Sequence, residues 1–241
     1  VRKLRGQGKK HCSMLIHVTR LTAVQEKVQE QVSNLLAAFR GGVRGFGEQE
    51  KTSLLEEWRT LWERDFVPTT NEIRSQVQEE AANCNLPSWE EVVVVLQDVL
   101  EDLVNVGVKT INGTAGDVLD YAAREEVGLK VIAVGGDKLA RGLTLEGLCV
   151  SYFVRSTRMY DTLMQMGRWF GYRLGFEDLC RVHLSHDSIN WYSHIAEASE
   201  ELVQQVKRMR RDGLSPEDFG LYVRSHPDSL LPTRWAPLRR F

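Results

Sequence analysis

Arginines placed beside glycines are the residues of this chain best suited to recognise phosphate. Arg141 precedes Gly142, and Arg168 follows Gly167 in a segment that continues to Arg173. A guanidinium group presents a planar fork of N–H donors that matches two phosphate oxygens at once. The spacing therefore points to phosphate handling around residues 131–173.

A Gly135-Gly136 pair stands directly after the apolar run Val131–Val134 and before Asp137 and Lys138. Exposed backbone N–H groups in a Gly-Gly loop before a helix can form an anion-binding concavity. The alternative is that the two glycines only make a tight turn, since short glycine motifs are weak signals. Both interpretations stay open from the residues alone.

Short apolar runs separated by helical patterns must position these residues. Such alternation is typical of an α/β fold, with a mainly parallel sheet covered by helices on both faces. The predicted strands are 13–18, 106–111, 130–134, 147–154 and 181–184.

Capping signals and apolar spacing predict the helices between these strands. Thr22-x-x-Gln25 opens the first helix, which we expect to break at 41–47. A polar helical insertion is expected over about 41–87, with a cap at Ser53-x-x-Glu56. Ser88-x-x-Glu91 starts a further helix that runs to about Val104. Other helices are expected over 116–126, 159–167 and 188–211.

Several of these segments resemble the motifs of superfamily-two helicases. Asp137-x-x-x-Arg141-Gly142-Leu143-Thr144 resembles motif V, and Gln165-Met166-Gly167-Arg168 with Arg173 resembles motif VI, the arginine-finger element. Met14–Arg20, MLIHVTR, resembles motif IV. The three occur in the order found in the second RecA-like lobe. The resemblance implies a RecA-like three-layer lobe in which Asp137, Arg141, Gly142 and Thr144 contact nucleotide, and Gln165, Arg168 and Arg173 are catalytic.

The same resemblance implies a nucleic-acid surface at the carboxyl ends of the strands, where ligands bind in open α/β sheets. Backbone amides and hydroxyls there would hold phosphates without choosing a sequence. The alternative for Thr19 and Thr114 is that they only cap helices. The candidate residues are Thr19, Arg20, Gly113, Thr114, Gly135, Gly136 and Lys138.

At closer range the chain resembles the Z-one domain family. The pattern comprises G-G-x-K-L-x-R-G-L-T-L-E-G-L, R-x-Y-D-T-L-M-Q-M-G-R-W-F-G-Y-R and E-D-F-G-L-x-V-R, and the resemblance covers about residues 12–235. The family carries an endonuclease label, is joined to a superfamily-two ATPase and belongs to bacterial restriction or phage-defence operons. Its members imply ATP and Mg²⁺ as cofactors, and DNA rather than RNA as the nucleic acid.

The sequence departs from the helicase pattern at three points. Thr144 stands where many helicases carry an Asp that touches the ribose. Gln165 is one residue closer to the Gly167-Arg168 pair than usual, and Arg173 is two residues further from it. Arg168 is therefore the better candidate for the finger.

The chain has no G-x-x-x-x-G-K-[ST] loop and no adjacent Asp-Glu pair. We therefore expect ATP and Mg²⁺ to be held mainly by a first lobe upstream, with 1–11 as a linker from it. Residues 12–211 would form the lobe, and 212–241 a truncated extension. A non-hydrolysing binding module and a metal-dependent endonuclease are the alternatives, although no nuclease carboxylate pattern appears and no metal site is predicted.

Composition limits these hypotheses only loosely. The 241 residues carry a net charge of −2, so nucleic-acid binding must depend on a local patch. No apolar run reaches the roughly 18–20 residues that a membrane helix needs. The four cysteines lie far apart in sequence and fit reduced, buried thiols in a cytoplasmic protein.

Overall fold

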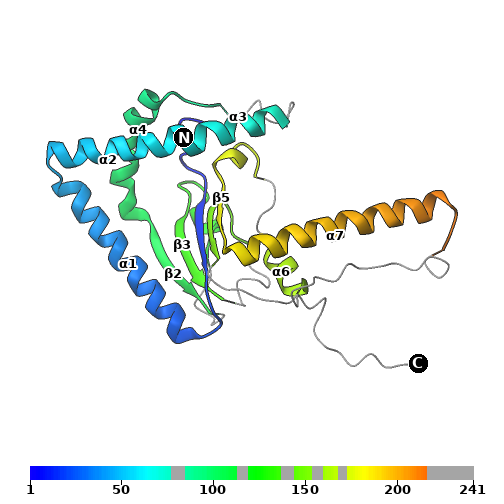
Figure 1. Cartoon of the computed structure of the whole chain (residues 1–241). Helices are drawn as coiled ribbons and strands as arrows, with labels where there is room; N and C mark the ends of the chain where they lie inside the picture. Colours follow the sequence, from blue (N-terminus) through cyan, green and yellow to red (C-terminus); the bar gives the residue numbers. More distant parts are fainter. Residues whose placement is uncertain (77–84, 113–118, 137–143, 154–159, 168–172, 216–241) are drawn as a thin grey trace. The chain divides into compact units, whose positions relative to one another are not determined.

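The structure, a computed structural model, describes residues 1–76, 85–112, 119–136, 144–153, 160–167 and 173–215 (Figure 1). The chain forms two compact units. The sheet unit comprises Val1–Phe153 and Trp169–His183, and the helical unit comprises Val154–Arg168 and Leu184–Phe241.

The sheet unit is built on a five-stranded parallel sheet in the order β2-β3-β1-β4-β5. The strands are β1 Cys12–His17, β2 Gly107–Ile111, β3 Lys130–Gly135, β4 Leu148–Phe153 and β5 Arg181–His183. Each coincides with a predicted apolar run. The prediction of an α/β fold is confirmed, and the fold is consistent with a RecA-like lobe.

The central strands are apolar because both of their faces are covered. Leu15, Ala133 and Val134 are completely inaccessible to solvent. Helix α1, Thr22–Gly45, covers one face, where Val28 and Val32 pack against the core (Figure 1).

Helix α1 differs from its prediction at both ends. Thr22 and Gln25 form no capping box: the Thr19 hydroxyl accepts a hydrogen bond from Leu21 N at 2.9 Å, and Gln25 donates to Thr19 O. The expected break at 41–47 is confirmed but is shorter: α1 continues to Gly45, and only Phe46 and Gly47 separate it from the next helix, which begins at Glu48. The glycines cost the helix only about 1 kcal/mol each. The Arg40 side chain, which donates to the carbonyls of Leu103 and Val106, helps to fix this turn.

Helices α2, Glu48–Leu61, and α3, Val67–Gln76, follow α1 and are joined by a π-helical turn, Trp62–Phe66. The expected cap at Ser53-x-x-Glu56 is wrong, because α2 already begins at Glu48. The Glu50 carboxylate accepts from Gly47 N at 2.9 Å instead. The Glu50 side chain is long enough to reach back to the free N–H group of Gly47, as a capping box requires.

Helix α4, Trp89–Asp102, begins as predicted. Glu91 N donates to the Ser88 hydroxyl at 3.2 Å, and Ser88 N donates to the Glu91 carboxylate at 2.8 Å. A 3₁₀ turn, Leu103–Asn105, then leads into β2.

The helix expected over 116–126 is wrong in its described part, 119–126. Only a 3₁₀ turn, Ala122–Arg124, forms there. The chain reverses at Gly128, which has a φ of 77° and donates its N–H to Arg124 O at 2.8 Å. Tyr121 N donates to Leu119 O and Ala123 N donates to the Asp120 carboxylate, both at 2.9 Å, and these local bonds replace the i→i−4 bonds of an α-helix.

The helical unit contains α6, Tyr160–Gly167, and α7, His186–Arg211, both as predicted. The Tyr192 hydroxyl donates to Leu163 O at 3.0 Å and so ties α7 to α6. Ser185 caps α7 by accepting from Ser188 N. Within the described residues, no helix has the length and apolarity needed to cross a bilayer.

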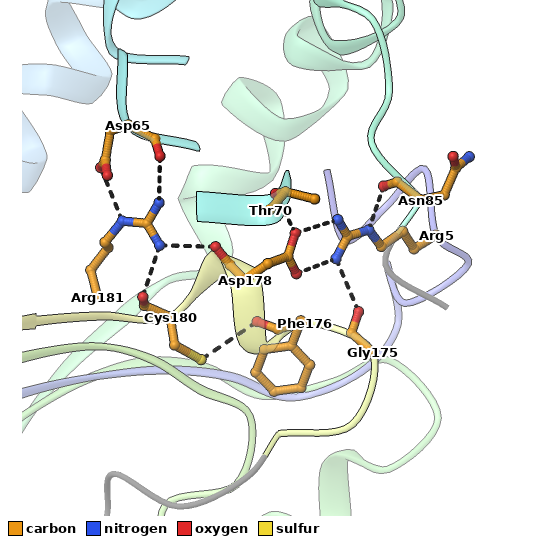
Figure 2. A network of polar contacts seen from close by, with 9 residues as sticks. All are labelled: Arg5, Asp65, Thr70, Asn85, Gly175, Phe176, Asp178, Cys180 and Arg181. Atoms are coloured by element: carbon orange, nitrogen blue, oxygen red, sulfur yellow. Dashed lines mark hydrogen bonds and ion pairs between the residues drawn. The ribbon is translucent and has the colours of Figure 1, made fainter. Parts of the chain in front are cut away.

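The N-terminal segment before β1, which the sequence assigns to a linker, packs into the sheet unit. Arg5 donates two hydrogen bonds of 2.7 Å to the Asp178 carboxylate, and the two side chains are 3% and 0% exposed (Figure 2). Arg5 also donates to the carbonyls of Asn85 and Gly175, and Thr70 donates to Asp178 at 2.6 Å. Whether the segment also connects to an upstream lobe stays a prediction.

Candidate functional site

Four strands end together at one edge of the sheet. In the parallel register, Gly135 of β3 lies opposite His17 of β1 and Ile111 of β2, and His17 lies opposite Phe153 of β4. The loops that follow these strands therefore start from one carboxyl edge. This is the edge at which ligands of open α/β sheets bind.

The strand order places a topological switch point between β1 and β4. From β1 the chain proceeds to β2 on one side of the sheet, whereas from β4 it proceeds to β5 on the other. Connections that leave neighbouring strands in opposite directions open a crevice at their carboxyl ends. The fold thus favours the ends of β1 and β4 as a ligand site.

His17 and Phe153 lie at this switch point. The His17 side chain is completely buried, and its ring stacks on Phe153 with centroids 5.0 Å apart and planes at 23°. Neither residue is among the site residues predicted from the sequence. The one sequence feature that could have pointed to this site is the histidine within the apolar run Met14–Val18.

The loops after β1 and β3 are in direct contact. A Cβ atom on Gly136 would lie 2.5 Å from Thr19 O and 2.9 Å from the Gln25 amide nitrogen. Gly135 and Gly136 are buried. Glycine is therefore required at 136 because another backbone occupies the space of a side chain. Gln25, also missed by the sequence analysis, is 3% exposed and holds this contact through its bond to Thr19 O.

Thr19 and Arg20 occupy the loop after β1. The Thr19 hydroxyl accepts from Leu21 N, which is the local capping role left open by the sequence. Arg20 is exposed, so its guanidinium is available at the carboxyl edge. The structure thus brings together Thr19, Arg20, Gly135 and Gly136.

Two other predicted site residues, Thr144 and Gln165, are also described. Thr144 is exposed and precedes β4 by four residues, and Gln165 is exposed on α6 of the helical unit. The predicted residues outside the described part of the chain are Asp137, Lys138, Arg141, Gly142, Gly113, Thr114 and Arg168.

Arg173 belongs to the sheet unit and lies in the segment before β5. Burial raises the pKa of the Cys180 thiol to about 11, and the positive charge of Arg173 opposes part of that rise. Cys180 Sγ contacts Leu148 O at the first residue of β4. The catalytic role of Arg173 stays a prediction.

A family model for the Z1 domain matches residues 1–231, nearly the whole chain. This chain belongs to the Z1 domain family. The match includes the first eleven residues, in keeping with the packing of Arg5 in the sheet unit of this Z1 domain.

No curated protein and no solved structure matches this chain. Membership of the Z1 domain family therefore rests on the family model. The resemblance to helicases rests on the sequence motifs alone. Among the described residues no group of three His, Cys, Asp or Glu side chains is arranged to hold a metal ion.

Proposed function

We propose that this Z1 domain is the second motor lobe of an ATP-dependent nucleic-acid translocase of the superfamily-two type. ATP and Mg²⁺ are held mainly by another lobe, and the carboxyl edge of this sheet faces DNA. The setting is the bacterial cytoplasm, in a restriction or phage-defence system.

The contact between the loops after β1 and β3 carries this proposal. Gly136 and Thr19 O meet beside the β1–β4 switch point, with Arg20 exposed next to them. Rigidly held backbone groups and the Arg20 guanidinium are suited to bind the phosphates of a nucleic-acid strand, whatever its base sequence. Gly113, Thr114 and Lys138 would extend this surface.

Arg168 is the proposed arginine finger. Hydrolysis of a nucleoside triphosphate builds negative charge on the transferring phosphoryl group, and a guanidinium placed against it lowers the barrier. Asp137, Arg141 and Gly142 would position the nucleotide from the loop after β3.

The test is Arg168→Ala in the full-length protein that contains the Walker lobe, measured as nucleic-acid-stimulated ATP hydrolysis. Turnover should fall by about 10³–10⁵-fold, the usual contribution of an arginine finger. Arg208→Ala, an exposed arginine on α7, is the matched control and should hydrolyse ATP normally. Normal turnover in Arg168→Ala would refute the assignment, provided that both variants unfold at the same temperature as the parent.

The departures from the helicase pattern at Thr144 and Gln165 favour a second candidate function, a lobe that binds nucleic acid without hydrolysis. Thr144 stands where many helicases carry the Asp that touches the ribose, and Gln165 is one residue closer to the Gly167-Arg168 pair than usual. In this case the full-length protein would bind DNA with salt-dependent affinity and release no phosphate from ATP. The same assay, run on the unmodified protein, separates the two functions.

A further inference from the structure

Two cysteines from neighbouring strands touch at the amino end of the sheet. Cys12 opens β1 and Cys149 is the second residue of β4, and their Sγ atoms are 3.8 Å apart. The register explains the contact: Ser13 pairs with Leu148 and Met14 with Val150, so Cys149 is an extra residue in β4. Such a bulge re-aims a side chain, here towards Cys12.

Positive charge surrounds the pair. The Arg2 guanidinium donates to Cys149 Sγ at 3.3 Å and to His11 O at 2.9 Å, and it lies over the Phe176 ring. Arg2 and Lys130 both favour a thiolate here. A thiolate is the nucleophilic form of cysteine.

The cysteines differ in their acidity. The hydrogen bond from Cys149 and the nearby charges lower the pKa of Cys12 to about 6, against the opposing effect of burial. The same partnership raises the pKa of Cys149, because the second proton must leave beside an existing charge. Burial raises the pKa of Cys180 to about 11. These opposite shifts favour a thiolate on Cys12 beside a thiol on Cys149.

The pair is also accessible to small molecules. Both cysteines are partly exposed and line a cavity of about 350 Å³, together with Arg2, Lys10 and Lys130. A peroxide molecule is far smaller than this cavity. Disulfide formation would require the two sulfurs to approach from 3.8 Å to about 2.05 Å.

We propose that Cys12 and Cys149 form a peroxide-reactive dithiol that closes reversibly into a disulfide. The Cys12 thiolate attacks one oxygen of hydrogen peroxide, the O–O bond breaks, and the products are a sulfenic acid and hydroxide. Cys149 then attacks the sulfenic sulfur, the S–S bond forms, and water leaves. In sum, two thiols and one peroxide give one disulfide and two waters.

The disulfide would join β1 to β4, the two strands that flank the switch point at their other ends. It would also remove the negative charge of the thiolate that the Arg2 guanidinium stabilises. The dithiol is independent of the proposed motor function, since none of its residues belongs to the carboxyl edge.

The experiment treats the purified chain with stoichiometric hydrogen peroxide, blocks remaining thiols with N-ethylmaleimide and maps the peptides by mass spectrometry. A Cys12–Cys149 linked peptide, two hydrogens lighter than the reduced pair and lost on treatment with dithiothreitol, is expected. Cys149→Ser should leave a sulfenic acid at Cys12 that dimedone traps. Cys180→Ser is the matched control and should keep the linkage. Linkage through Cys84 or Cys180 instead would overturn the proposal.

A second measurement uses the unmodified chain, so its result does not depend on whether the variants fold. With limiting iodoacetamide at pH 7, Cys12 should be alkylated at least tenfold faster than Cys180 in the same sample. Equal rates would contradict the proposed reactivity of Cys12.

Discussion

At the scale of single residues, one buried ion pair connects distant parts of the sheet unit. Asp178 accepts two hydrogen bonds from Arg5 of the N-terminal segment and one from Thr70 of α3 (Figure 2). Two further bonds place the Arg5 guanidinium against Asn85 O and Gly175 O. A charge buried so completely is stable only while its partner remains.

Removing one partner should therefore be far worse than removing both. We expect Asp178→Ala to lower the free energy of unfolding by about 3–5 kcal/mol, because the Arg5 charge stays buried and unpaired. Urea denaturation of the chain measures this change. The double variant Arg5→Met with Asp178→Leu should recover most of the loss.

The matched control is Asp98→Ala. Asp98 pairs with Lys3 at 2.6 Å, but these side chains are 61% and 43% exposed. Such surface pairs contribute less than about 1 kcal/mol. A loss at Asp178 no larger than the loss at Asp98 would contradict the account of the buried pair.

At the scale of elements, two of the three predicted caps give opposite results. Ser88 and Glu91 exchange hydrogen bonds at the start of α4, whereas Thr22 and Gln25 do not at the start of α1. We expect Ser88→Ala to cost about 1 kcal/mol of stability. Thr22→Ala should leave the free energy of unfolding nearly unchanged, since Ala is the better helix former. Comparable losses in the two variants would show that Thr22 does act as a cap.

Strands could be predicted from the sequence more reliably than helix ends. Val131–Val134 is an apolar run, and Leu15–Val18 is apolar except for His17, as expected of strands covered on both faces of a sheet. The point within 41–47 at which α1 ends could not be predicted, because the contacts of Arg40 with Leu103 O and Val106 O join residues far apart in sequence. Tertiary contacts there outweigh the low helix propensity of glycine.

The candidate site shows the same limit. Gly135 and Gly136 could be predicted as special positions, but the reason at Gly136 is the approach of Thr19 O, which only the fold reveals. Gln25 was read as a cap and instead links two loops. Arg173 was chosen from motif spacing alone, and its catalytic role stays a prediction.

At the scale of the whole molecule, this chain of two units lacks the sequence signature of a nucleotide-holding lobe. We expect the isolated chain to show no micromolar ATP binding by titration calorimetry, because the Gly-rich loop and Lys that cradle phosphates are missing. Binding in the micromolar range would mean that this Z1 domain holds the triphosphate by itself. A protein that carries the proposed ATPase lobe together with this chain, titrated in parallel, is the positive control.

The backbone contact at Gly136 has a mechanical consequence. Since the loop after β3 rests on the carbonyl of Thr19 without an intervening side chain, a shift of one loop by a few tenths of an ångström must displace the other. If a nucleic-acid strand is bound as proposed, tension on one of these loops would thus be transmitted to the other.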